Sequence, residues 1–229
     1  DGGTALPALR ELGPVAQWAD PWAEVASGGV QYAHGEHAAA GWAAVQLVLP
    51  RASLDAVAEL VSEGRIRAAG LTSLDALEIR AWRPSSADAD ERAIPHEFDW
   101  LRTAVHLNKG CYRGQETVAK VHNLGHPPRR LALLHLDGSR GELPAAGALV
   151  FAEGGSASPD ARPLGRITRA ALHHEWGGVA FALLKRSVPE DAALEVRLGD
   201  PERGAEAEVV AAAQEVIVPA DAGATREIP

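Results

Sequence analysis

The amino-acid sequence predicts an α+β protein with two parts, a mixed N-terminal part and a C-terminal part made of short strands. Residues 42–82 carry the pattern of one strand followed by two helices. Pro127 and Pro128 then interrupt the chain, and six short apolar segments punctuated by Gly and Pro follow them. Because proline cannot continue a helix and short punctuated strands are typical of a small barrel or sandwich, we place the two parts at residues 1–128 and 129–229.

The N-terminal part is expected to contain one strand and two helices before a polar loop. Residues 1–40 show no clear period, whereas residues 42–49 alternate weakly and end at a proline, which favours a strand. Residues 53–64 place leucine and valine at helical spacing between a serine and a glycine. Thr72 and Asp75 resemble a capping box ahead of a second helix, and residues 83–93 are polar.

The chain then offers one further helix and the strands of the C-terminal part. Residues 98–107 regain apolar spacing, and residues 116–121 are expected to begin a short helix, because an acidic side chain is favourable in a first turn. The strand candidates are residues 131–136, 148–151, 165–172, 179–185, 194–198 and 207–213. The third and fourth candidates are joined by a glycine-bounded turn, which predicts a hairpin.

Composition and charge restrict the classes of function. The chain has 229 residues and a net charge of −9, which argues against DNA binding because such binding draws on clustered cations. No apolar run approaches the ~20 residues that span a bilayer, and no secretory leader opens the chain. One cysteine excludes an internal disulfide and suits a reducing compartment, so we expect a cytoplasmic protein with no membrane contact. Because methionine is absent, we expect the chain to be part of a longer protein.

Residues 109–116, with the sequence Lys-Gly-Cys-Tyr-Arg-Gly-Gln-Glu, hold the only cysteine of the chain and are called the octapeptide below. A thiol reacts as its thiolate, and neighbouring cations favour that form. Lys109 and Arg113 lie two residues on either side of Cys111. The alternative is a buried structural cysteine, which is usually found in an apolar run. We therefore predict that Cys111 is a functional thiol and that Lys109 assists it.

The octapeptide resembles the Lys-Gly-Cys-Tyr-x-Gly-Gln-Glu hallmark of the YgfZ-type folate-binding proteins, which are relatives of the aminomethyltransferase, or T-protein, of glycine cleavage. Residues 94–101 and 121–130 are similar to the flanks found in actinobacterial members, and the resemblance covers about residues 42–219. It implies an aminomethyltransferase-like folate-binding α/β portion, with its N-terminal part missing, followed by a six-stranded antiparallel β-barrel. It also implies that tetrahydrofolate lies in a cleft between these parts and that Cys111 faces the cleft.

The resemblance further implies a function and partners. YgfZ-type proteins support the assembly or repair of iron–sulfur enzymes and affect tRNA modification, so the expected partners are a reduced folate and iron–sulfur client proteins. Clusters usually need four protein ligands, and one cysteine cannot hold a cluster alone. Cys111 is therefore expected to act as a redox-sensitive group or a transient ligand.

Individual positions match or depart from the T-protein pattern. The corresponding T-protein segment lacks the cysteine, which favours the YgfZ type. The glutamate that holds the pterin in T-proteins is replaced by Arg80, and a nearby glycine by Trp82. Glu97 matches a later glutamate near the folate, and a carboxylate suits the adjacent N–H donors of an aminopyrimidine. A capping carboxylate is the alternative role of Glu97.

The residues expected to bind the cofactor have structural alternatives as well. They are Glu97, Tyr112, Arg113, Gln115 and Glu116. Tyr112 would stack on a flat ring or pack between domains, whereas Gln115 and Glu116 would bind the ligand or the backbone of the turn. Residues 109–130 contain five cations and one acid, which would attract a polyglutamyl folate tail or a phosphate unless acids elsewhere balance them. Arg129 and Arg130 would anchor an anion or join neighbouring domains through carboxylates.

Other chemistries have weaker support. His122 and His126 are four residues apart, but Gly125 and Pro127 disfavour the helix that would bring them together, and no metal site is expected. The main alternative function is a folate-dependent aminomethyltransferase or demethylase, a one-carbon transferase that would need a carboxylate base in the missing segment. A scaffold that binds only proteins is the third interpretation.

Overall fold

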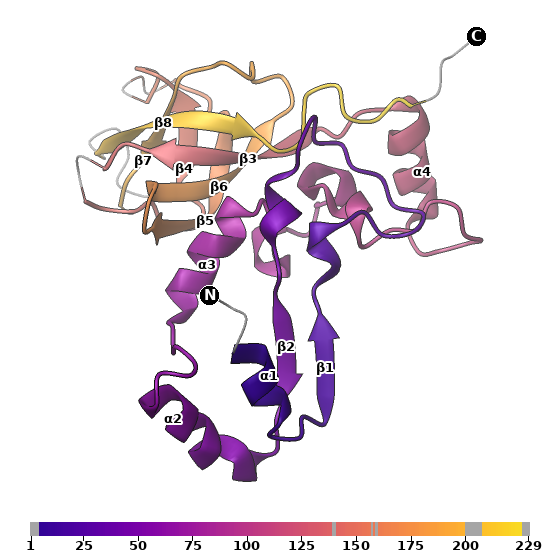
Figure 1. Cartoon of the computed structure of the whole chain (residues 1–229). Helices are drawn as coiled ribbons and strands as arrows, with labels where there is room; N and C mark the ends of the chain where they lie inside the picture. The colour runs from indigo at the N-terminus through magenta and orange to yellow at the C-terminus, as the bar shows by residue number, and fades with distance from the viewer. Residues whose placement is uncertain (1–4, 139–140, 157, 159, 200–207, 226–229) are drawn as a thin grey trace.

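The computed structural model describes residues 5–138, 141–156, 158, 160–199 and 208–225 (Figure 1). A barrel lies at the upper left of the view, α4 lies at the right, and a two-stranded ribbon extends downward between them. None of the helices in these residues is long and apolar enough to cross a membrane.

The N-terminal part contains the strand and two helices that the sequence predicted, together with two elements that it did not. Its elements are α1 (Ala5–Arg10), β1 (Ala16–Ala19), β2 (Val45–Val48), α2 (Leu54–Ser62) and α3 (Leu71–Arg80), with short 3-10 turns between them. The predicted strand at 42–49 is β2, and it pairs antiparallel with β1. All four residues of β1 are exposed, so no apolar alternation marks this strand in the sequence.

The predicted capping box at Thr72 is wrong. Helix α3 begins at Leu71, and its N-cap is Gly70, which has no side chain to cap the helix. Thr72 is therefore already helical, whereas an N-cap residue must have a non-helical backbone. A capping box is found instead at Ser85, whose side chain accepts from the Ala87 amide while Asp88 accepts from the Ser85 amide at 2.7 Å.

Trp82 has a positive φ of 55°, a conformation that bulky side chains rarely adopt. The T-protein pattern has glycine at this position, and glycine adopts this conformation at no steric cost. Two interactions hold Trp82 in place. Its indole N–H donates to Glu215 at 3.1 Å, and its ring packs edge-on against His37 with centroids 5.0 Å apart.

The C-terminal part is a closed, fully antiparallel barrel of six strands, as predicted, rather than the sandwich. The strands are β3 (Arg129–Leu136), β4 (Leu149–Ala152), β5 (Gly165–His173), β6 (Gly177–Lys185), β7 (Leu194–Arg197) and β8 (Val209–Val216). They follow each other around the barrel in the order β3-β6-β5-β4-β7-β8. The β5–β6 hairpin is confirmed, whereas Ala207, the predicted start of the last strand, lies outside the described residues.

Strand β6 faces two apolar cores because it is buried on both sides. Val179, Phe181 and Leu183 pack outward against the N-terminal part, while Ala182 and Leu184 face the interior of the barrel. Successive side chains of a strand point to opposite faces, so this alternation follows directly from the strand geometry. The outward core includes Ile79 of α3 and the fully buried Phe98 and Leu101.

Ion pairs also join the barrel to the N-terminal part. Arg169 of β5 bonds to Asp75 at 3.0 Å and to Asp88 at 3.1 Å, and it also bonds to Glu78. Arg129 of β3 bonds to Asp90 at 2.6 Å and to both carboxylate oxygens of Glu97 at 2.8 Å. A bidentate arginine–carboxylate pair is both strong and directional.

After β8 the chain leaves the barrel and packs along α4 (Gln115–Leu124), where the yellow segment that follows β8 lies beside this helix in Figure 1. The Val218 amide donates to the Leu131 carbonyl oxygen at 3.1 Å, and the Thr225 amide donates to the His122 carbonyl oxygen at 3.0 Å. Helix α4 covers the predicted segment 116–121 and extends it to Leu124. Residues 217–225 therefore form part of the packing of the N-terminal part.

We predict that Gly29→Ala destabilises the fold. An added β-carbon would lie 2.7 Å from the carbonyl oxygen of Leu101, which is backbone and cannot rotate away. We expect the free energy of unfolding in urea to fall by about 1–3 kcal/mol, as for other overpacked sites. Gly41→Ala is the control, because nothing lies within 4 Å of the added carbon, and an equal loss in both variants would contradict the prediction.

We also predict an acid-sensitive contribution from Asp90. The hydrogen bond from Arg129 lowers the pKa of Asp90 from 3.8 to about 2. Because the folded-state pKa is lowered, this contribution is complete above the unfolded pKa of about 3.9 and is lost as the pH falls through 2. The difference in unfolding free energy between the wild type and Asp90→Asn should therefore shrink between pH 5 and pH 2. A difference that stays constant over this range would contradict the assignment.

Candidate functional site

The octapeptide forms an exposed loop that leads into α4. Cys111 is exposed to solvent, and so are Lys109 and Arg113. Gly114 is the N-cap of α4, and its φ of +80° is the left-handed conformation that glycine adopts without strain. The thiol is thus held near the N-terminal end of a helix and can be reached from solvent, as a reactive cysteine must be.

The other side chains of the octapeptide make few contacts with one another. The Lys109 ammonium lies 5.8 Å from the centre of the Tyr112 ring, and the backbone N–H of Gln115 donates to the backbone carbonyl oxygen of Tyr112 at 3.2 Å. Glu116 lies in the first turn of α4 and is exposed. Among the described residues, no ion pair involves Lys109, Arg113 or Glu116, so these charges are available to a partner.

Two of the cations expected to attract an anion are occupied within the fold. Arg129 is bonded to two carboxylates, as described above. Arg130 is completely buried and donates to Gln214 at 2.8 Å and to the Val188 carbonyl oxygen at 3.1 Å. The basic stripe that remains at the surface consists of Lys109, Arg113 and Lys120, which are all exposed. Of the two roles considered for Arg129, joining neighbouring parts is the one seen here.

Glu97 is fully buried, and both its oxygens are engaged. It accepts both hydrogen bonds of the Arg129 fork, and it accepts from the Ile94 amide at 3.2 Å, which is the capping role. A pterin would have to displace Arg129 to reach this carboxylate. In this structure Glu97 thus supports the fold of residues 94–98.

A polar cluster of Tyr32, His96 and His122 holds α4 against the rest of the fold. The Nε2 atom of His96 donates to the Val118 carbonyl oxygen at 3.0 Å, and burial lowers the pKa of His96 to about 4, so the ring is neutral at pH 7. Tyr32 stacks on His96 and bonds to His122 at 3.0 Å, and burial raises its pKa. This cluster fixes the helix on which the thiol loop ends.

A hollow of about 790 Å³ lies between α3 and residues 36–44 and is called the α3 hollow below. Its walls are mostly alanine and leucine, including Leu74 and Leu77. Trp42 contributes an indole ring, and Glu36 and Arg80 contribute charges. No residue of the octapeptide lines it, and neither does Glu97. The sequence marked Arg80 as a departure from the T-protein pattern, but it gave no signal for Glu36 or Trp42.

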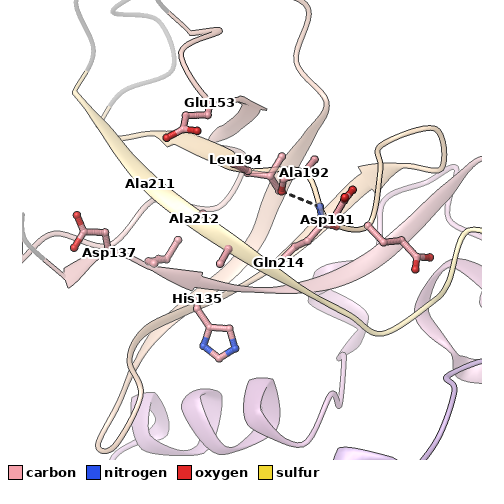
Figure 2. Close-up of a pocket in the computed structure, with 13 residues that line it drawn as sticks. His135, Asp137, Glu153, Asp191, Ala192, Leu194, Ala211, Ala212 and Gln214 are labelled. Atoms are coloured by element: carbon pink, nitrogen blue, oxygen red, sulfur yellow. Dashed lines mark hydrogen bonds between the residues drawn. The ribbon is translucent and has the colours of Figure 1, made fainter.

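A second hollow of about 570 Å³ lies on the wall of the barrel (Figure 2). Its floor contains Ala211 and Ala212, and carboxylates such as Glu153 and Asp191 surround it. The ring of His135 points away from these alanines in Figure 2, and it bonds to Glu215 at 2.9 Å. Apart from His135, whose ring is engaged with Glu215, the lining has no aromatic side chain, and this hollow offers less chemistry than the α3 hollow. A third, of about 430 Å³, is formed around residues 49–57.

The histidines do not form the pair considered in the sequence. His122 bonds to Tyr32, whereas His126 bonds to the Ala222 carbonyl oxygen at 2.8 Å. The structure instead brings His173, His174 and Glu175 together, with one potential ligand atom of each lying within 4.8 Å of the others. The Nδ1 atom of His173 already accepts from the Glu175 and Trp176 amides at 3.2 Å, which leaves this nitrogen occupied.

Comparison with known proteins gives one distant relationship. No family model matches the chain. A chloroplastic protein of Arabidopsis thaliana, described as a "Putative transferase", is 34% identical to the chain over 94 residues. These residues make up 39% of this chain and 21% of the relative, so the chain spans about a fifth of the relative's length. The similarity fits a transferase-like relationship over part of the chain.

We predict that Cys111 in the folded protein reacts readily with iodoacetamide. Because its thiol is exposed, the alkylation rate should lie within about tenfold of the rate in denaturant at the same pH. Intact-mass spectrometry identifies the site without ambiguity, since the chain has one cysteine. Cys111→Ser is the control and should remain unmodified. Protection of the wild type by more than a hundredfold would contradict the exposure seen here.

Proposed function

We propose that this chain belongs to a reduced-folate-binding protein of the YgfZ type, which supports iron–sulfur enzymes through the thiol of Cys111. The observation that carries the proposal is the exposure of Cys111 on a loop with two unpaired cations. A thiol in this setting is accessible to another protein. The partial similarity to a protein described as a "Putative transferase" fits a transferase-like relationship.

The α3 hollow is the proposed site of the folate. Its volume of about 790 Å³ lies within the range of ligand sites, and such sites are mostly apolar with a few polar groups. The Trp42 indole offers a flat face for a pteridine ring, and its N–H is fixed by a 2.9 Å bond to Asp20. In this arrangement the folate and the thiol occupy different elements, so the folate would act on Cys111 through the fold or on a shared partner.

The proposed role of Cys111 is that of a transient ligand or redox-sensitive group for an iron–sulfur client. Four protein ligands usually hold a cluster, and this chain supplies one thiol. The client protein would therefore contribute the remaining ligands. The exposed Lys109, Arg113 and Lys120 would help to attract an acidic surface of the client.

A folate-dependent one-carbon transferase is the second candidate function, and the description of the plant relative as a transferase favours it. The two functions differ in turnover. Incubation of the full-length protein with tetrahydrofolate and a methylated amine would yield a one-carbon folate if the protein is an enzyme. Tight binding without turnover would support the assembly role.

We predict that Leu77→Glu impairs the binding of 5-formyltetrahydrofolate, measured by calorimetry. Leu77 lines the α3 hollow and is 42% exposed, so the new charge would enter the site without unfolding the core. The affinity should fall about tenfold, which corresponds to about 1.4 kcal/mol. Leu71→Glu is the matched control, because Leu71 lies on the same helix, is 80% exposed and does not line the hollow. Equal affinities of the two variants would contradict the location of the site.

We further predict that Cys111→Ser retains folate binding but fails to restore iron–sulfur enzyme activity in cells that lack the protein. The side chain is exposed, so the substitution should leave the fold intact. If Cys111→Ser restored iron–sulfur enzyme activity as well as the wild type does, the proposed role of the thiol would be wrong.

A further inference from the structure

The α3 hollow contains two charged side chains of opposite sign, Glu36 and Arg80. Building on the proposed folate site, we propose that they recognise the two ends of the ligand. Glu36 binds the aminopyrimidine edge of the pterin, and Arg80 binds the carboxylate of the glutamate tail. The remaining walls of the hollow supply apolar contact and the flat Trp42 ring between these charges.

Arg80 differs from the other arginines around α3 because its charge is not neutralised. Arg83 bonds to Glu78 at 2.8 Å, and Arg129 and Arg169 bond to the carboxylates named above. Among the described residues no carboxylate pairs with Arg80, although the chain carries a net charge of −9. An unpaired guanidinium beside an apolar hollow is suited to a carboxylate of a ligand, which it can bind through two parallel hydrogen bonds.

The guanidinium of Arg80 is also held in place before any ligand arrives. Arg80 is the last residue of α3, and its guanidinium carbon lies 5.3 Å from the centre of the Trp176 ring in the β5–β6 hairpin. Stacking on an aromatic face leaves the N–H groups at the edge of the guanidinium free to donate. A lysine would share the charge but would lack the planar fork.

Glu36 has the complementary chemistry. It is exposed, and no hydrogen bond or ion pair engages its carboxylate within the described part of the chain. The neighbouring His37 is buried and caps the next turn by accepting from the Ala39 amide at 3.1 Å, which fixes the backbone that carries Glu36. An ionised carboxylate has hydrogen-bond acceptors and no donor, so it fits the adjacent N–H groups of an aminopyrimidine.

The test compares two ligands, 5-formyltetrahydrofolate and 5-formyltetrahydropteroate, which lacks the glutamate. In the wild type the glutamate should strengthen binding about tenfold. In Arg80→Met this advantage should disappear, because the ligand with the glutamate loses its contact with Arg80 and both ligands then make the same contacts. In Glu36→Gln both ligands should bind about tenfold more weakly while the advantage of the glutamate remains.

Arg67→Met and Glu24→Gln are the matched controls, because both residues are exposed and neither lines the hollow. Circular dichroism would verify that each variant is folded. Retention of the glutamate advantage in Arg80→Met, or unchanged affinities in Glu36→Gln, would overturn the assignment while leaving folate binding established. If the wild type bound neither ligand, the proposed function would fail, and this inference with it.

Discussion

The placement of α3 against the barrel depends on Arg169. This side chain extends from β5 into a group of three carboxylates, one of which, on Asp88, is fully buried. A buried carboxylate without a cation is costly, so the loop that carries Asp88 can occupy its position only when Arg169 is present. Helix α3 provides the other two carboxylates, and it also forms one wall of the α3 hollow. The position of one wall of the proposed binding site therefore depends on ion pairs that neighbouring side chains of the same helix make with the barrel.

Local sequence signals were sufficient for the barrel but not for the site. The six strands were predictable because Gly and Pro separate short apolar segments, and residues 179–184 of β6 form a continuous apolar run because they face two cores in turn. The prediction of a capping box at Thr72 was wrong because threonine and aspartate are also tolerated inside a helix. Strand β1 was missed because its side chains are exposed, so that only pairing with β2 defines it.

The candidate site illustrates the same limit. Exposure of Cys111 was predictable from the charges around it, and the structure confirms it. Arg129 and Glu97 bond to each other, and Arg129 also bonds to Asp90. No local sequence pattern reveals these partners, so their roles were not predictable. Glu36 and Trp42 meet Arg80 only through the packing of α3, so no local sequence pattern indicates them. The ligand contacts predicted for Tyr112 and Gln115 stay predictions.

Residues 217–225 follow the barrel strands in the sequence and pack on α4 of the N-terminal part, so they join the two parts of the chain. The thiol loop ends on a helix that is covered by the last segment after β8, so the helix emerges from the ribosome long before its cover. A fragment ending at residue 128 would leave uncovered the flank of α4 that Ala224 and Thr225 contact. The loop that carries Cys111 can therefore reach the setting described here only after the strands of the barrel and residues 217–225 have been synthesised.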